Sequence, residues 1–380
     1  MDYTKYQFEE VVTLFDKQRI PLSSMERAKR PGKYRYYGAQ GIIDYIDDYI
    51  FDGEYLLLAE DGENLKSNKQ DLAQLVDGKF WVNNHAHILR TKEVCRLRYF
   101  YYWINNKNMA EYVTGSAQPK LSQASLKKMI IHLPSLEIQD RILNVITPID
   151  EKIKENTKIN ENLEQQAATY FYHHFIANAD PSWKEGTISD LGTVVGGSTP
   201  SKKKSEYYTD NGSAWITPKD LSVDKSKFIS HGADDITELG LKNSSASIMP
   251  PGTVLFSSRA PIGYIAVADG EVTTNQGFKS VVPHSNVGTA FVYYFLKNAL
   301  PTIENMASGS TFKEISGGAM RTVPAIIPDD ERLLEFTDFC EPLFQQQRTL
   351  EAENRFLAAL RDSLLPKLMS GELDVSGLDL

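Results

Sequence analysis

The sequence predicts an α+β protein with two globular domains of mixed α/β character, separated by two long helices that form an antiparallel coiled coil. Three observations support this fold class. The chain has 380 residues, which is more than one hydrophobic core usually organises. Its two halves match each other at a nearly constant offset, so we expect a pseudo-twofold internal repeat. Each half also contains a helix-like segment whose apolar residues alternate in steps of four and three.

The internal repeat is anchored on two glycines. Gly309 follows Gly115 by 194 positions (309 − 115) when YVTGSAQPKLS is aligned with NMASGSTFKEIS. Gly, Pro and Asn recur at this offset, and these residue types hold backbone positions that others fill poorly. The further identical pairs are Ser116/Ser310, Ser122/Ser316, Pro134/Pro328, Glu137/Glu331, Pro148/Pro342, Asn160/Asn354 and Leu163/Leu357, with Tyr101/Tyr293 and Tyr102/Tyr294 at an offset of 192 (293 − 101).

An amide pair interrupts a run that otherwise looks like a buried strand. In EVTTNQGFKSVVP, Asn275 and Gln276 precede a glycine, and Asn83 and Asn84 stand 192 positions earlier (275 − 83). Because the pair occurs twice, we expect it to have a shared role. Two interpretations remain open at this point: the amides cap a turn at a strand edge, or they belong to a binding surface.

The segment 134–175 is predicted to be helical, with Glu137 in its first turn, and the second half begins a helix at Pro328 in the same way. Pro148 and Pro342 are expected to break each helix after about two turns. We expect the two long helices to pack against each other; the alternative is that each packs only on its own domain. The predicted seams are Ile142, Ile146, Ile149, Ile153, Asn156, Asn160, Leu163, Ala167, Tyr170 and Phe336, Cys340, Leu343, Gln347, Leu350, Asn354, Leu357, Arg361, Leu364.

The remaining segments contain short strand-like runs with Gly and Pro between them, and each closes with a helix, around 94–113 and 287–306. The expected division is therefore globe, helix, globe, helix. Its boundaries are 1–133 for the first globular domain, 134–178 for the first helical spacer, 179–327 for the second globular domain, and 328–380 for the second spacer and tail.

Composition points to a cytoplasmic protein without metal or disulfide frameworks. There are two cysteines and no C-x-x-C or Cys/His cluster, and no apolar run approaches the length of a membrane span. The formal net charge of −9 argues weakly against nucleic acid, but basic residues cluster in ERAKRPGKYRYYG and SKKKSEYY. Taken alone, such clusters also fit solvated loops.

Known catalytic signatures are missing. VVGGSTPSKKKS has neither phosphate-loop nor dinucleotide-loop spacing, and H-E-x-x-H, G-x-S-x-G and kinase motifs are absent from the sequence. An amino-methyltransferase loop is absent as well. His85 and His87 in NNHAHIL would lie on one face of a strand, but a third ligand is not evident, so we favour ordinary packing over metal binding. We therefore expect no catalysis, no cofactor and no metal.

Several segments together resemble the specificity subunits of type I restriction-modification enzymes. They are GSAQPKLS and GSTFKEIS, LPSLEIQDRI, FSSRAPIGYIAVADGEVTTNQGF and LLPKLMSGELDV, and the likeness covers nearly the whole chain. The sequence departs from the family pattern at two places. The second helix start, IPDDERLLEF, lacks the Gln that LPSLEIQDRI has, and the first globe has LLLAEDGENL where the second has SSRAPIG.

The resemblance implies a non-catalytic subunit whose partner is double-stranded DNA. It does not imply a membrane partner. Each globe would be a target-recognition domain for one half of a bipartite, asymmetric target. The helices would dock methyltransferase subunits, expected to number two, and through them the restriction and translocation subunits. A 28-residue helix over 149–176 would measure about 42 Å, or roughly 12 base pairs of B-DNA. The helices would then set the spacing of the half-sites.

Candidate DNA-binding residues follow from this expectation. Lysines and arginines in the basic clusters are expected on phosphates, and amides and Arg259 on bases, because Asn and Gln suit adenine and Arg suits guanine. The set is Lys29, Arg30, Lys33, Arg35, Tyr36, Asn83, Asn84, Lys202, Lys203, Lys204, Ser258, Arg259, Asn275, Gln276 and Lys279. Two other readings stay open: a coiled-coil protein scaffold without DNA readout, and an enzyme whose motif is not recognised.

Overall fold

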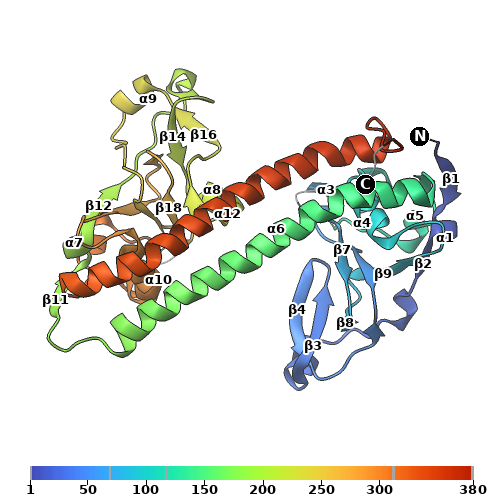
Figure 1. Cartoon of the computed structure of the whole chain (residues 1–380), viewed down its shortest axis with the longest axis horizontal. Helices are drawn as coiled ribbons and strands as arrows, with labels where there is room; N and C mark the ends of the chain where they lie inside the picture. Colours follow the sequence, from blue (N-terminus) through green and yellow to red (C-terminus); the bar gives the residue numbers. More distant parts are fainter. Residues whose placement is uncertain (1, 68–69, 116–117, 310–312, 378–380) are drawn as a thin grey trace. The chain divides into compact units, whose positions relative to one another are not determined.

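The computed structural model describes residues 2–67, 70–115, 118–309 and 313–377. Ser116 and Ser310, which belong to the predicted repeat, lie outside the described residues. The chain forms two compact units, Met1–Lys152 with Phe356–Leu380, and Ile153–Arg355. Both boundaries fall inside long helices, α6 (Leu136–Phe171) and α12 (Asp330–Ser370), coloured green and red in Figure 1. Each unit therefore combines one globular module with parts of both helices.

The first module, which precedes α6, contains two sheets and a two-stranded ribbon. The sheet orders are β2-β9-β6-β7 and β4-β3-β8-β5, and β1 pairs with β10. Its elements are β1 (Thr4–Gln7), α1 (Phe8–Val11), β2 (Val12–Leu14), η1 (Asp16–Gln18), α2 (Ser24–Ala28), β3 (Pro31–Gly38), β4 (Gly41–Ile46), β5 (Phe51–Asp52), β6 (Tyr55–Ala59), α3 (Asn64–Ser67), β7 (Ala73–Val76), β8 (Lys79–Val82), β9 (Ala86–Thr91), α4 (Leu97–Asn105), η2 (Ala110–Tyr112), α5 (Gln123–Leu126) and β10 (Ile130–Leu133).

The second module lies between the π-helical turn that follows α6, η3 (Tyr172–Ala177), and α12. Its sheets have the orders β12-β20-β17-β18-β15 and β13-β16-β14-β19, and β11 pairs with β21. Its elements are β11 (Lys184–Thr187), α7 (Ile188–Leu191), β12 (Gly192–Gly196), η4 (Ser205–Tyr207), β13 (Tyr208–Thr209), β14 (Ser213–Ile216), α8 (Pro218–Val223), β15 (Phe228–Ile229), β16 (Asp234–Ile236), α9 (Glu238–Lys242), β17 (Val254–Ser258), β18 (Ile262–Ala268), β19 (Thr273–Thr274), β20 (Lys279–Pro283), α10 (Thr289–Met306), α11 (Gly317–Arg321) and β21 (Pro324–Ile327).

The two modules share most of their strand order, which confirms the predicted internal repeat; β15 adds a fifth strand to the larger sheet of the second module. The order β2-β9-β6-β7 in the first corresponds to β12-β20-β17-β18 in the second. Each module also has a parallel strand pair, β3 with β8 and β14 with β19: Tyr36 lies opposite Trp81, and Trp215 lies opposite Thr273. Trp81 of β8 and Thr273 of β19 differ by 192 positions (273 − 81), which is the offset found in the sequence.

The long helices are continuous, and the predicted breaks at Pro148 and Pro342 are wrong. α6 spans 36 residues and α12 spans 41. A proline inside a helix costs about 3 kcal/mol, but packing of the helices offsets this cost: Ile146 and Cys340, each two residues before a proline, are fully buried. In the part of the chain that the structure describes, no helix is both long and apolar enough to cross a membrane.

The helices pack against each other in antiparallel directions, as predicted. In the second unit, Asn156 Nδ2 donates to Asn354 Oδ1 at 3.0 Å, and further along α6 the Asn160 Nδ2 donates to Glu351 Oε1 at 3.1 Å. In the first unit, Arg361 contacts Asp150 at 3.1 Å. The residue number rises on α6 as it falls on α12. The alternative, in which each helix packs only on its own domain, is wrong.

A buried polar cluster joins both helices to the second module. The Lys227 ammonium, 5% exposed, pairs with Glu164 of α6 and donates to Gln347 Oε1 of α12 at 2.6 Å. Glu351 of α12 accepts from the backbone N–H of Lys227 at 2.9 Å. Burial raises the pKa of Glu164, but the charges of Lys227 and Lys297 outweigh it and lower this pKa to about 2. The cluster thus holds an ionised carboxylate inside the unit.

We expect the Lys227→Met substitution to lower the free energy of unfolding at pH 7 by about 2–3 kcal/mol, because the partly buried Glu164 carboxylate loses one of its two lysine partners and keeps Lys297. Adding Glu164→Gln should restore part of the loss. Since the pKa of Glu164 lies below its ordinary value, its stabilisation is present above about pH 4.5 and disappears as the pH falls towards about 2. Urea denaturation across this range measures both effects.

The exposed pair of Lys242 and Glu238 provides the control for that measurement. Both side chains are more than half exposed, so Lys242→Met should change stability little. An equal loss in the Lys242 and Lys227 variants would show that the buried cluster has no special weight.

Candidate nucleic-acid interface

The turn between β19 and β20 explains the amide pair of the second module. The Asn275 N–H donates to Ile216 O at 3.0 Å, and its Oδ1 accepts from the Gly277 N–H at 2.8 Å. Gln276 is exposed, and its Oε1 accepts from the Thr199 hydroxyl. The Asn275 side chain is therefore a turn cap, whereas Gln276 presents its amide at the surface.

The first module has the same turn between β8 and β9. Asn83 is 8% exposed, its N–H donates to Tyr37 O at 3.0 Å, and its Oδ1 accepts from the His85 N–H at 2.8 Å. Asn84 is exposed. Asn83 and Asn275 thus satisfy the turn-cap interpretation, and the surface interpretation applies to Asn84 and Gln276.

The segment FSSRAPIG lies directly against the Asn275 turn. Ser258 is fully buried, and both its N–H and its hydroxyl donate to Gly277 O, at 2.7 and 3.0 Å. The Lys279 ammonium donates to Gln276 O at 3.4 Å. Ser258 therefore supports the turn and does not face solvent, so its proposed contact with DNA is corrected to a structural role.

An ion pair stands at the edge of this cluster. Arg259 Nη1 lies 3.3 Å from Glu314 Oε2, and both side chains are more than one-third exposed. Lys279 lies 3.8 Å from the same carboxylate. Burial lowers the pKa of Lys279, the charge of Arg259 lowers it further, and Glu314 opposes both. Arg259, Lys279 and Gln276 thus form one surface with two cations and an amide.

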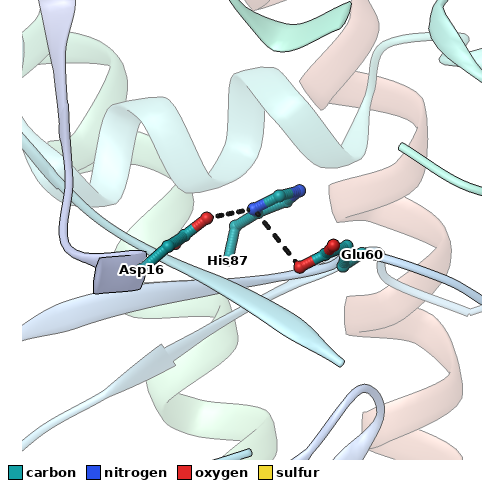
Figure 2. Close-up of side chains that lie close together, drawn as sticks. All are labelled: Asp16, Glu60 and His87. Carbon is teal, nitrogen blue, oxygen red and sulfur yellow. Dashed lines mark hydrogen bonds and ion pairs between the residues drawn. The ribbon is translucent and has the colours of Figure 1, made fainter. Parts of the chain in front are cut away.

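In the first module, the residue that corresponds to Lys279 is His87, 192 positions earlier (279 − 87). His87 is buried, and Figure 2 shows its surroundings. His87 Nδ1 lies 2.6 Å from Asp16 Oδ2 and 3.8 Å from Glu60 Oε2, and its Nε2 lies 2.7 Å from Leu121 O. The three side chains have metal-ligand types within 4.8 Å of one another. Both ring nitrogens of His87 have hydrogen-bond partners in the protein, and Asp16 and Glu60 are the ligand-type neighbours that the sequence did not reveal.

The electrostatics of the histidine cluster favour ionised carboxylates. Burial raises the pKa of Asp16, but hydrogen bonds from His87, the Ile88 N–H and Gln123 outweigh it, so the pKa falls below its ordinary value. The pKa of Glu60 is likewise lowered, because the Arg19 hydrogen bond and the His87 charge exceed the effect of burial. The cluster joins η1, the end of β6 and β9 through charge-assisted hydrogen bonds.

His85 differs from the prediction that it shares a strand face with His87. The strand β9 begins at Ala86, so His85 lies in the preceding turn with 48% of its side chain exposed, whereas the His87 side chain is 1% exposed. His85 Nδ1 contacts Asp61 Oδ2 at 2.7 Å.

In the basic segment of the first module, the two lysines are exposed and the two arginines pair with aspartates. Lys29 and Lys33 are exposed. Arg30 pairs with Asp47 at 2.8 Å, and Arg35 donates to Asp77 O and pairs with its carboxylate.

Tyr36 requires a correction. It is fully buried, its hydroxyl accepts from the Leu22 N–H at 2.9 Å, and the Arg27 guanidinium lies 5.1 Å from its ring centre. Tyr36 packs in a small core cluster with Ile46 and Trp81, so its side chain is not available at the surface.

The lysine run of the second module is fully on the surface. Lys202, Lys203 and Lys204 are exposed, and Lys204 Nζ donates to Tyr207 Oη at 3.0 Å. This loop leads away from Thr199, the partner of Gln276. A Cβ placed on Gly197 would lie 2.0 Å from Asn275 O, so the loop can approach the turn only because residue 197 is glycine.

Sequence reasoning missed three participants: Thr199, Asp61 and Glu314. The signal for Glu314 was available, because the repeat aligns it with Lys120 in a segment already singled out (314 − 120 = 194). Thr199 and Asp61 lack such a signal, since their roles depend on the positions of Gln276 and His85 in space.

Comparisons with known proteins agree on one class. The fold is similar to that of the S subunit of a type I restriction-modification system from M. genitalium, with a TM-score of 0.63 over 97% of this chain and 96% of that one, at 18% identity. Residues 1–165 and 181–354 match the type I restriction modification DNA specificity domain. The chain belongs to this family.

Two relatives illustrate the range of sequence similarity. The type I restriction enzyme MjaIX specificity subunit of Methanocaldococcus jannaschii is 38% identical over 192 residues, which span 48% of this chain and 44% of that protein. The type I restriction enzyme HindI specificity subunit of Haemophilus influenzae is 24% identical over 425 aligned positions, which span 90% of this chain and 89% of the relative.

We expect Asn275→Ala to lower the free energy of unfolding by about 1 kcal/mol, because the Gly277 N–H loses its acceptor. Asn275→Asp retains the acceptor and should lose less. Gln276→Ala, on the same turn but at an exposed side chain, should change stability by less than about 0.5 kcal/mol. Equal effects of Asn275→Ala and Gln276→Ala in thermal unfolding would rule out the turn-cap role.

Proposed function

We propose that this chain is the DNA-reading subunit of a type I restriction-modification enzyme. The observation with the greatest weight is that one capped turn occurs twice with different exposed side chains: Asn84 in one module and Gln276 in the other, with His85 and Arg259 beside these turns. Such a pair of surfaces suits two unlike half-sites of a bipartite, asymmetric target. We further propose the divisions 1–133 and 179–327 as the target-recognition domains, with 134–178 and 328–380 as helical spacers.

The charge distribution supports DNA contact in spite of the net charge of −9. Lys29, Lys33, Lys202 and Lys203 are exposed and suit phosphate contacts, which position a protein without reading sequence. Arg30 and Arg35 have carboxylate partners and would have to exchange them for phosphates. Lys204 is exposed next to Tyr207 and belongs to the same surface.

The helix pair suits a second role, as spacer and docking element. A 36-residue helix such as α6 measures about 54 Å, longer than the 28-residue segment expected from the sequence, because Pro148 does not end it. We propose that α6 and α12 set the distance between half-sites and bind two methyltransferase subunits, which supply the catalysis that this subunit does not perform. The restriction and translocation subunits would join through them, in the cytoplasm.

DNA binding distinguishes this function from a protein scaffold. The chain, copurified with a methyltransferase subunit, should bind duplex DNA with an affinity that falls steeply with salt. Each phosphate contact contributes about 0.9 to the logarithmic salt slope. Replacing Lys29, Lys33, Lys202 and Lys203 by Ala should reduce that slope by about 3–4. Replacing the exposed Lys5, Lys17, Lys127 and Lys184, four lysines outside both basic clusters and both long helices, should not. A salt-independent affinity would favour the scaffold.

Exchange of one module tests the division of labour. Replacing 179–327 by the corresponding segment of a relative should change one half of the recognised sequence and leave the other half and the spacer intact. Mapping of methylated sites in cells that contain the chimaera measures this outcome. A change in both halves would contradict two separate reading modules.

A further inference from the structure

Three backbone contacts around Ser258 hold three segments of the second module together, and we call this set of contacts the frame. The Ser258 N–H donates to Gly277 O at 2.7 Å, and its carbonyl accepts from the Ile315 N–H at 3.1 Å. Beside it, Arg259 and Glu314 form an antiparallel bridge. Three segments that are distant in sequence therefore meet at residue 258, and Arg259 is the first side chain beyond it.

The first module repeats this frame around Glu60. The Glu60 N–H donates to His85 O at 2.9 Å, its carbonyl accepts from the Leu121 N–H at 2.8 Å, and Asp61 forms the antiparallel bridge with Lys120. The frames coincide contact by contact. Asp61 therefore occupies the place of Arg259, and Lys120 occupies the place of Glu314.

The charges at these equivalent places are inverted. The second module presents Arg259, and the first presents Asp61; opposite them stand Glu314 and Lys120. Each presented group is also held by one contact that leaves part of it available. Glu314 contacts Nη1 of the Arg259 fork, and His85 contacts Oδ2 of the Asp61 carboxylate.

Stability does not explain these pairs. Arg259 and Glu314 are 38% and 39% exposed, and Asp61 and His85 are 21% and 48% exposed. Exposed ion pairs contribute little to folding, about 0–1 kcal/mol, and the backbone contacts already fix the frame. In the first module the more buried charge, Glu60, is balanced separately by Arg19 at 2.7 Å.

We propose that Arg259 and Asp61, which occupy the same place in the two modules, each read a base of the DNA target. This inference rests on the proposed function. Arg259 would bind guanine through O6 and N7, and Asp61 would accept from an exocyclic amino group, on cytosine or adenine, in the other half-site. Glu314 and His85 are positioning residues. The duplicated frame thus presents a donor to one half-site and an acceptor to the other.

The test selects preferred sequences from a randomised duplex library, using the full chain copurified with a methyltransferase subunit. Arg259→Ala should abolish a guanine preference at one position of one half-site, with a loss of discrimination of about tenfold or more. Asp61→Ala should abolish a preference for an amino-bearing base in the other half-site. Glu314→Gln should weaken the guanine preference without changing the salt slope, whereas Arg259→Lys should retain part of it.

Lys242→Ala is the matched control, because this lysine also forms an exposed pair, with Glu238 on α9, away from both long helices, and should leave every preference unchanged. Thermal unfolding confirms that each variant is folded. Unaltered preferences in the folded Arg259 and Asp61 variants, or changes in the same half-site for both, would overturn the assignment while the proposed function stands. A wild-type complex that enriches no sequence would instead overturn the proposed function.

Discussion

Each module completes its core with parts of both long helices, and this constraint governs the molecule. In the first unit, Ile142 and Ile146 of α6 and Leu368 of α12 are fully buried in one cluster with the strands. In the second unit, Ala167 of α6 and Phe336 of α12 do the same. Because α12 follows the second module in sequence, the first core cannot close until the end of the chain is in place.

Because the helices run antiparallel, each module meets a part of both. Two tyrosines at equivalent positions attach the modules to α6. Tyr102 of α4 donates to Asp150 of α6, which Arg361 of α12 neutralises at 3.1 Å. Tyr294, its equivalent in α10, donates to Glu164 of α6 at 2.8 Å. The position of the tyrosine is kept while its carboxylate partner changes. The duplicated modules therefore attach to the helices through the same aromatic position but different ion pairs.

The sequence predicted the features that depend on periodicity and repetition: the α+β class, the internal repeat and the antiparallel helix pair. It failed where tertiary packing overrides a local preference. Pro148 ends a helix in isolation, yet burial of Ile146 and its neighbours keeps α6 continuous. Tyr36 lies in a basic segment of the sequence, but it packs into a core cluster with Ile46 and Trp81.

The amides show a different limit of sequence reasoning. The repeat marked Asn83, Asn84, Asn275 and Gln276 as important without separating their roles. Only the coordinates show that the first of each pair accepts from an N–H two residues on, and that the second is exposed. A recurrence in sequence identifies a shared frame, and exposure then selects the side chains that are available to a partner.

In each module, backbone contacts hold the three segments together, and the half-exposed side chains beside them differ between the modules. Backbone contacts at Glu60 and Ser258 do not depend on side-chain identity, so the neighbouring residues can change sign without disturbing the fold. The buried groups in the same region have less freedom: His87 must satisfy Asp16 and Leu121, whereas its counterpart Lys279 contacts Glu314 near the surface. Divergence is therefore cheapest at the half-exposed positions one residue beyond the frame, where a single substitution alters the hydrogen-bonding character presented to a partner and leaves the core unchanged.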